Sequence, residues 1–193
     1  MTAELDKELI ENVISGFPDS GGWSLIRCAE IARHPSDTSH SPNWNLLLER
    51  IGPEAGLYAF LLPKSEFNEP FTFQLYGPRK NGEARRVPFK VDVKYLDSVL
   101  GDRFVAYVGR SANLRKRLQW HFHATKNSTA AQVREALCHA RQCEIRDALR
   151  FMVEHACVAY YRLPGDLNVA NRDIVEVALW AKYLSPFNIK SER

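Results

Sequence analysis

Three short apolar runs constrain the fold of this chain more than any other feature of its sequence. They cover residues 56–62 (GLYAFLL), 103–109 (RFVAYVG) and 157–163 (CVAYYRL). Each is rich in aromatic and apolar residues, and the first lies between Pro53 and Pro63, a pattern typical of a strand buried in a sheet. A buried sheet needs helices to cover its faces, so the runs predict an α/β (α+β) core.

Helical patterns fill most of the remaining chain. Apolar residues recur every three to four positions from Leu5 to Ile14, and Ser111 precedes a run of good helix formers. Asn168 or Asn171 can cap the last helical segment. We expect helices over residues 5–17, 43–50, 112–123, 129–153 and 168–184. The turn formers of residues 34–42 predict a loop.

The segment between the first two apolar runs, residues 63–102, is expected to be an insert. It holds two weaker strand candidates, residues 71–76 and 87–93, and the turn-prone sequence GPRKNG between them. The sequence therefore predicts an inserted hairpin with a basic tip.

Length and composition favour a single core. A chain of 193 residues with 45% hydrophobic residues can bury one ordinary core and carry a small appended segment. We expect an N-terminal helical extension over residues 1–52 and one catalytic domain over residues 53–193, with the insert at 63–102.

The sequence also indicates where the protein is found. Its apolar stretches are far shorter than the roughly 20 residues that cross a bilayer, and its N-terminus lacks the pattern of a secretory signal. We therefore expect a cytoplasmic protein that does not enter membranes. The four cysteines are too scattered for a disulfide framework and are expected to be reduced, as small buried residues rather than metal ligands.

Positive charge is concentrated in one part of the chain. Residues 79–117 hold eleven basic and four acidic residues, a net charge of +7, whereas the whole chain carries +3 and the remainder therefore −4. Such segregation suits a face that binds a polyanion, because basic groups that neutralise phosphates release counterions. A solvated basic surface without a partner is the alternative.

Several residues whose side chains could take part in catalysis follow one another in an order that is unlikely to arise by chance. They are the triplets GLY at 56–58 and YVG at 107–109, Arg117, His121 one helical turn later, Glu176 in an apolar segment, and Pro186-Phe187-Asn188. Together they resemble the signature of the GIY-YIG endonucleases, with Leu and Val where that family usually has Ile. The resemblance covers residues 56–62 and 104–188. It implies a three-stranded antiparallel sheet flanked by helices and the hydrolysis of phosphodiester bonds in DNA.

Two of these residues have roles that their chemistry alone supports. Glu176 is an acid among apolar neighbours, so it must find a divalent ion, a basic side chain or a hydrogen-bond donor. Magnesium or manganese is the expected cofactor, with Glu176 as its ligand. Arg117 keeps its charge at any working pH and offers a planar fork that suits a scissile phosphate.

The other site residues rest on the resemblance for their roles. It implies that Tyr58 helps to activate or orient the attacking water and that Tyr107 positions water or phosphate. His121 lies on the same helix face as Arg117 and can accept a proton near neutral pH. Whether Tyr58, His121 or a water on the metal takes the proton is left open by the sequence.

Supporting and binding roles fall to further residues. Gly109 is expected to permit a tight strand-to-helix turn, Gly56 to avoid a clash, and Asn188 to order the end of the Glu176 helix through its amide. The expected DNA contacts are Arg79, Lys80, Arg85, Arg86, Arg110, Arg115 and Lys116.

The expected function is a divalent-metal-dependent endonuclease acting on double-stranded DNA. A stand-alone chain with a sizeable insert resembles the sequence-specific type II restriction enzymes of the family, for which cutting both strands would call for a homodimer. A structure-specific repair or recombination nuclease and a nuclease toxin or antiphage effector are alternatives, as is a DNA-binding module that has lost catalysis.

Overall fold

A four-stranded antiparallel sheet forms the centre of the protein. The computed structural model describes residues 7–31, 51–76, 86–122, 131–163 and 169–188. The sheet has the strand order β1-β6-β2-β5, with β1 at Trp23–Arg27, β2 at Gly56–Pro63, β5 at Arg103–Ser111 and β6 at Cys157–Arg162. Strands β2, β5 and β6 confirm the three buried strands that the apolar runs predict.

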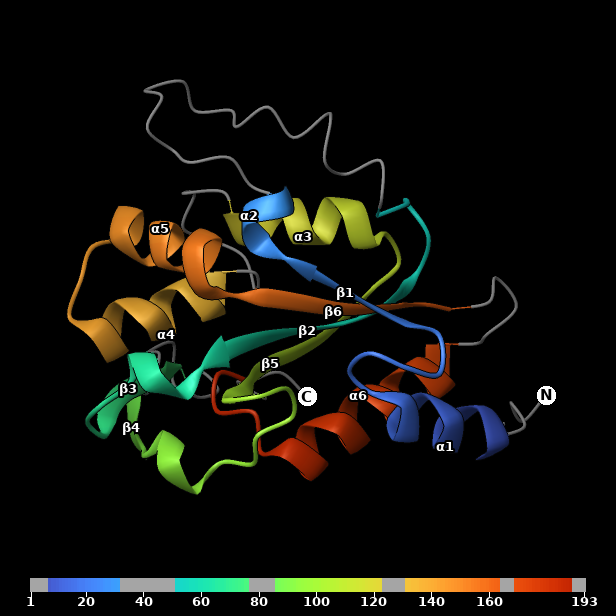
Figure 1. Cartoon of the computed structure of the whole chain (residues 1–193), viewed down its shortest axis with the longest axis horizontal. Helices are drawn as coiled ribbons and strands as arrows, with labels where there is room; N and C mark the ends of the chain where they lie inside the picture. The colour runs from blue at the N-terminus through green and yellow to red at the C-terminus, as the bar shows by residue number, and fades with distance from the viewer. Residues whose placement is uncertain (1–6, 32–50, 77–85, 123–130, 164–168, 189–193) are drawn as a thin grey trace, which may run out of the picture.

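Helices cover both faces of this sheet (Figure 1). Their bounds are α1 Lys7–Gly16, α2 Cys28–Ile31, α3 Leu114–Phe122, α4 Ala131–Arg141, α5 Ile145–His155 and α6 Val169–Tyr183. Helices α2, α3, α4 and α5 lie on one face, and α1 and α6 lie on the other. The α/β (α+β) class predicted from the sequence is confirmed.

The arrangement of helices explains why β2 is an uninterrupted apolar run. Tyr58, Phe60 and Leu62 point into the core under α3, α4 and α5, whereas the alternate residues, among them Leu57 and Leu61, point into the core under α1 and α6. Side chains on a strand alternate between faces, so a strand with two covered faces needs apolar residues at every position.

A β-bulge in β5 decides which face one of its tyrosines joins. The register with β2 pairs Phe60 with Tyr107 and Leu61 with Val105, so Ala106 is an extra residue. As a result, Ala106 and Tyr107 both point into the core under α3, although they are consecutive in sequence. The bulge thus brings Tyr107 to the face that carries Tyr58.

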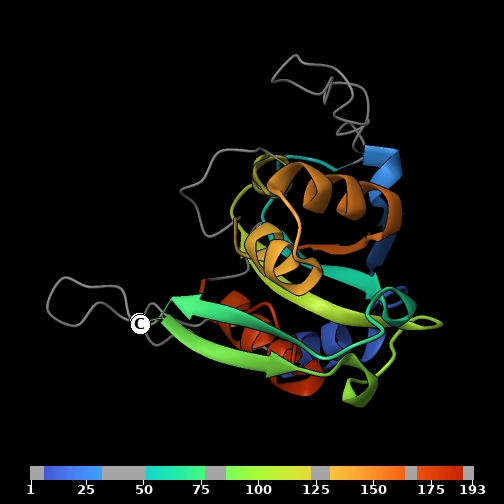
Figure 2. The same cartoon turned by 90° about the vertical axis from the view of Figure 1, so that its left-hand side faces the viewer.

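The inserted hairpin is present and forms a separate two-stranded sheet. Strand β3 (Phe71–Tyr76) pairs antiparallel with β4 (Arg86–Val91), as predicted, and short 3₁₀ helices at Lys64–Glu66 and Val93–Tyr95 connect it to the core. Figure 2 shows the hairpin beneath α4, and β3 packs against that helix. Its predicted basic tip, residues 77–85, lies outside the described residues.

The N-terminal segment is more than a helical extension, which corrects both that prediction and the three-stranded sheet. Helix α1 confirms the first predicted helix and packs against α6. Strand β1 follows it and adds a fourth strand beside β6, with Trp23 and Ile26 buried. Five residues with only two inward positions are too short a pattern to be recognised as an edge strand. The predicted loop at 34–42 and helix at 43–50 lie outside the described residues.

The helical region predicted over 129–153 is two helices. Helix α4 ends at Arg141, Gln142 takes a positive φ of 49°, and α5 begins at Ile145. The N–H of Cys143 donates to the carbonyl of Cys138 at 3.1 Å, a bond that closes the end of α4. All four cysteines are free thiols. None of the helices within the described residues has the length and apolar character that crossing a membrane requires.

Candidate functional site

The hydroxyl of Tyr58 is the centre of the candidate site. Tyr58 lies in the middle of β2 and is fully buried. Its hydroxyl oxygen lies 2.8 Å from Nε2 of His121 and accepts a hydrogen bond from Nε of Arg117 at 3.1 Å. Three residues of the signature found in the sequence are therefore one hydrogen-bonded chain.

Helix α3 presents Arg117 and His121 to that hydroxyl from consecutive turns. The helix begins immediately after β5, where Oδ1 of Asn113 accepts from the N–H of Lys116 at 2.9 Å and caps the first turn. Leu114 and Leu118 are fully buried and fasten the helix to the sheet. Residues four apart share a helix face, so the same face carries the guanidinium and the imidazole.

Aromatic rings enclose His121 and fix the orientation of its imidazole. The centroid of its ring lies 5.4 Å from that of Tyr58, 5.5 Å from that of Tyr107 and 4.9 Å from that of Phe60, all in edge-on arrangements. The imidazole is fully buried. His121 therefore acts on its surroundings through Tyr58 rather than through direct contact with solvent.

Gly109 has a different role from the predicted turn. Strand β5 continues to Ser111, so Gly109 lies within the strand, directly opposite Tyr58. A Cβ at this position would lie 2.5 Å from both Cζ and the hydroxyl oxygen of Tyr58, which is closer than atoms can approach. Glycine is required here because the Tyr58 ring crosses over the strand at this point.

Gly56 avoids a clash, as the sequence analysis expected. It is the first residue of β2, and a Cβ there would lie 2.3 Å from the carbonyl oxygen of Tyr161 and 2.4 Å from Cδ1 of Leu114. The missing side chain lets the start of α3 pack onto the sheet.

Burial determines the ionisation of the two tyrosines. Removal from water raises the pKa of Tyr58 well above its ordinary value, Tyr107 raises it further, and the nearby Arg117 opposes the shift. Burial likewise raises the pKa of Tyr107, while Arg117 acts in the opposite direction. Burial disfavours the charge of Arg117, but the two tyrosines outweigh it and raise the pKa of the guanidinium. At neutral pH both phenols are protonated and Arg117 is charged.

The Tyr58 hydroxyl also hydrogen-bonds to the side chain of Tyr107, and the proton that it shares with His121 can be placed in two ways. In each, the oxygen accepts from Arg117. Either the hydroxyl donates to Nε2 of a neutral His121 imidazole, or Nε2–H donates to the hydroxyl. Since the phenol keeps its proton, Tyr58 is a hydrogen-bonding group in this structure and not a base.

Glu176 lies on the other side of the sheet edge, on α6. Its Oε2 accepts a hydrogen bond from Nε of Arg110 at 3.1 Å, and Oδ1 of Asp173 lies 2.8 Å from the same nitrogen. Arg110 is three residues after Tyr107 on β5, so this strand connects the carboxylates to the tyrosines. The structure thus gives Glu176 a basic partner, one of the alternatives that the sequence left open, and uses for it an arginine that was expected to contact DNA.

Asp173 is a residue that the sequence analysis missed. It precedes Glu176 by three positions on a helix, and this spacing places both carboxylates on one face. Side-chain exposures of 24% for Asp173 and 23% for Glu176 leave both side chains partly exposed, although Oδ1 of Asp173 is itself buried. The spacing was visible in the sequence and could have been used.

The carboxylate pair fits a hard divalent ion. Its oxygens already converge on one cationic group, and magnesium binds proteins through one or two carboxylates, with water and phosphate oxygens completing its shell. Among the residues that the structure describes, no group of three or more His, Cys, Asp or Glu side chains gathers as a metal cage. Glu176 and Asp173 would therefore hold an ion that takes its other ligands from water and substrate.

Asn188 fastens the chain after α6 to the outer edge of β5. Its Oδ1 accepts from the N–H of Val108 at 2.7 Å, and its Nδ2 donates to the carbonyl of Val108 at 2.5 Å. The neighbouring Phe187 donates its N–H to the carbonyl of Ala106 at 2.9 Å. Asn188 was expected to order the end of the Glu176 helix through its amide, whereas in the structure both amide atoms bind β5, the strand that carries Tyr107 and Gly109.

The remaining basic residues are divided between the core and the surface. Nε of Arg115 donates to the carbonyl of Ile51 at 3.0 Å and fastens α3 to the chain before β2. Lys116 is exposed, with its Nζ 5.4 Å from the centre of the Trp120 ring. Arg86 begins β4. Arg79, Lys80 and Arg85 lie outside the described residues.

Comparison of the chain with family models, with curated proteins and with solved structures yields no match.

Proposed function

We propose that this protein is a divalent-metal-dependent DNA endonuclease. The observation that carries the proposal is the hydrogen-bonded chain from Arg117 through Tyr58 to His121, with distances of 3.1 and 2.8 Å. A core tyrosine needs one partner for its hydroxyl, whereas this one engages a charged guanidinium and an imidazole in a buried setting. Such an arrangement fixes a cation in one orientation, which is what binding a scissile phosphate demands.

Arg117 is the residue proposed to contact the substrate. It is half-buried, and its guanidinium hydrogen-bonds to the side chains of Tyr58 and Tyr107, which hold a planar fork of the kind that binds two phosphate oxygens. A cation held in place before the reaction stabilises the charge that develops on a pentacoordinate phosphorus without having to reorganise.

Tyr58 and His121 are proposed to act as positioning residues. Both are fully buried, and the raised pKa of Tyr58 keeps its proton in place. In the proposed arrangement Tyr58 donates to a neutral His121 and accepts from Arg117, which satisfies the hydroxyl and aligns the guanidinium. Neither residue then needs to remove a proton from water.

Glu176, with Asp173 beside it, is proposed to hold the metal ion. A bound magnesium or manganese ion would lower the pKa of a water molecule and neutralise phosphate charge. Because Arg110 binds the same carboxylates, it would maintain their spacing while the ion is absent. Of the possible biological settings, we propose restriction-type cleavage of duplex DNA, since the chain carries a hairpin beside its core.

Cleavage of supercoiled plasmid with and without magnesium tests the proposal. We expect magnesium-dependent nicking or linearisation by the wild type, and a loss of at least about 100-fold in Arg117→Ala and Glu176→Gln, the size typical of removing one transition-state contact. Glu144→Gln is the matched control, because Glu144 is exposed and its side chain makes no capping bond to α5. Cleavage that persists in Glu176→Gln, or none by the wild type, would refute the proposal.

The ends of the fragments then identify the type of nuclease. A repeated motif at the ends is the result expected for a restriction enzyme. Scattered ends would indicate a toxin or antiphage nuclease, and cuts confined to branched substrates would indicate repair or recombination. Binding of DNA without any cleavage would indicate a binding module.

A further inference from the structure

A buried arginine outside the proposed site is bound to the backbone of a site residue. Arg134 lies on α4, and only 2% of its surface is exposed, the lowest value among the arginines for which the structure gives one. Its Nη1 donates to the carbonyl oxygen of Trp120 at 2.6 Å and to that of His121 at 2.8 Å. Both carbonyls belong to the last turn of α3.

The location of these carbonyls explains what the guanidinium does. Helix α3 ends at Phe122, and the last carbonyls of a helix have no N–H partner within it. They also carry the partial negative charge of the helix C-terminus, which favours a cation. Arg134 therefore closes the end of α3 from a neighbouring helix.

Placing a charge in this position is costly, which argues against an incidental contact. Burial lowers the pKa of Arg134, while Glu135 opposes the shift. An apolar side chain such as leucine would fill the same space without this cost, but it could not bind the carbonyls of α3.

We propose that Arg134 is a positioning residue of the active site. By fixing the backbone of His121, it sets the distance from Nε2 of His121 to the hydroxyl of Tyr58, and through that hydroxyl the orientation of Arg117. This inference rests on the proposed function for its effect on catalysis, but the effect on His121 can be observed without any substrate.

The test compares Arg134→Met with the conservative Arg134→Lys. We expect Arg134→Met to lower kcat by about tenfold or more, with KM within about twofold of wild type, because Arg117 is still present but misaligned. We expect nitrogen and proton NMR signals of the His121 imidazole to lose the shift that the hydrogen bond to Tyr58 gives them. Arg134→Lys keeps a charged donor and should recover part of both properties.

Arg141→Met is the matched control for a loss of stability. Arg141 lies on the same helix, but it donates to the carbonyl of Glu66 at 3.0 Å and packs on the ring of Phe151. Its replacement should lower the stability to urea and leave the His121 signals and kcat unchanged. Wild-type His121 signals in folded Arg134→Met, or an equal change in Arg141→Met, would overturn the inference.

The two proposals can fail separately. If the wild type does not cleave DNA, the proposed function is wrong, whereas the NMR comparison still decides whether Arg134 positions His121. If Arg134→Met does not fold, Arg134→Gln takes its place in the comparison with Arg134→Lys.

Discussion

At the scale of single residues, burial decides which chemistry Tyr58 can perform. A tyrosine that removes a proton from water must reach that water and must ionise without much cost. Tyr58 is fully buried, and its pKa lies well above the ordinary value because the phenolate would be removed from water. The nearby Arg117 charge reduces this shift but does not reverse it. A positioning role agrees with both observations.

The raised pKa predicts how Tyr58 affects stability at alkaline pH. An unfolded tyrosine ionises at about pH 10, whereas the folded Tyr58 phenol keeps its proton to higher pH. Above that pH the unfolded state binds fewer protons than the folded state, so the free energy of unfolding falls as pH rises, by up to about 1.4 kcal/mol per pH unit for this group. Tyr58→Phe removes this contribution.

Urea unfolding between pH 8 and 11.5 measures the effect. At pH 8 we expect Tyr58→Phe to be less stable than the wild type by about 1 to 3 kcal/mol, because the hydroxyl no longer binds His121 and Arg117. The difference should narrow above pH 10. Tyr95→Phe, which removes a phenol that is 79% exposed, should follow the wild type throughout. A constant difference between wild type and Tyr58→Phe would show that the phenol ionises alike in both states.

At the scale of elements, the outer edge of β5 depends on Asn188. The side-chain amide donates to and accepts from the backbone of Val108, as a neighbouring strand would. Tyr107 and Gly109 flank Val108, so this contact fixes the strand on both sides of the position opposite Tyr58. The segment after α6 thereby completes the sheet edge beside the carboxylates.

Replacement of Asn188 should therefore affect both stability and activity. We expect Asn188→Ala to lower the free energy of unfolding by about 2 to 3 kcal/mol, because two backbone groups lose their partner, and to lower kcat. Asn188→Asp should be no more stable than Asn188→Ala. Its carboxylate can accept from the Val108 N–H, but its second oxygen faces the Val108 carbonyl oxygen and the two repel. Urea unfolding measures the stability of both variants, and plasmid cleavage measures kcat.

Ser185→Ala provides the comparison for that experiment. The hydroxyl of Ser185 donates to Oδ1 of Asn188 at 2.5 Å and makes no bond of its own to β5 among the hydrogen bonds described here. Its loss should cost about 1 kcal/mol. Equal losses in Ser185→Ala and Asn188→Ala would mean that the bonds to Val108 contribute nothing measurable.

The elements that the sequence predicted are those whose pattern is local. Strand β2 is apolar at every position because both of its faces are covered, and the hairpin strands alternate around a turn-forming segment. Strand β1 escaped prediction because two buried residues in five do not distinguish an edge strand from a loop. The break between α4 and α5 depends on the positive φ of Gln142, which no residue type at that position announces.

The site was predictable to the extent that spacing determines it. A separation of four positions on a helix places Arg117 and His121 on one face, and the observed contacts of both residues with Tyr58 agree with that inference. The reason for Gly109 was not predictable, because it lies in the path of a side chain from the neighbouring strand. Arg134 was also missed, because its role depends on an element distant in sequence: its partners are backbone carbonyls of another helix.

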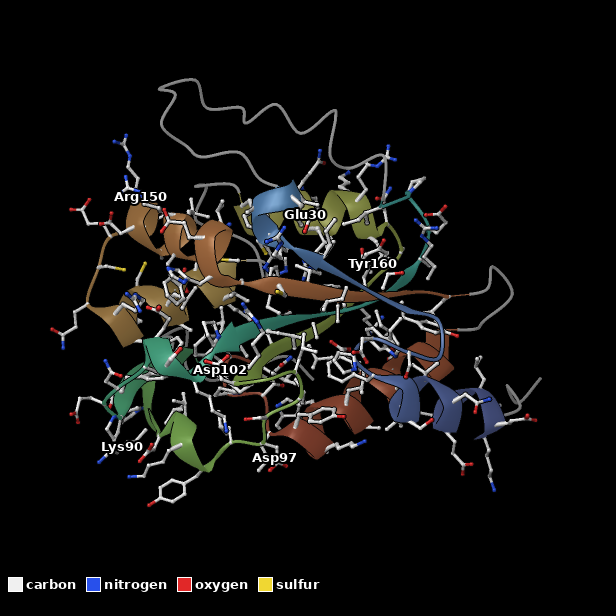
Figure 3. The ribbon with its side chains drawn as sticks, in the orientation of Figure 1. Glu30, Lys90, Asp97, Asp102, Arg150 and Tyr160 are labelled. Atoms are coloured by element: carbon white, nitrogen blue, oxygen red, sulfur yellow. The ribbon has the colours of Figure 1, made fainter. Side chains whose placement is uncertain are left out.

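At the scale of the whole molecule, basic residues are concentrated in the chain from the hairpin to α3. Residues 79–117 carry a net charge of +7 in a chain whose total is +3. Lys90 on β4 and Lys116 on α3 are exposed members of this group, which the structure places on two separate elements. Figure 3 shows Arg150, an exposed residue of α5, on a different part of the surface from Lys90.

These positions predict how the proposed binding of DNA depends on salt. Each lysine that neutralises one phosphate should contribute about 0.9 to the slope of log affinity against log salt concentration. We expect Lys90→Ala and Lys116→Ala each to reduce the slope by about one, and Arg150→Ala to leave it unchanged, in titrations of a fluorescent duplex without magnesium. A reduction in Lys116→Ala alone would mean that the duplex lies along α3 and does not reach the hairpin. Equal reductions in all three variants would refute a role confined to the basic segment 79–117, because Arg150 lies outside that segment.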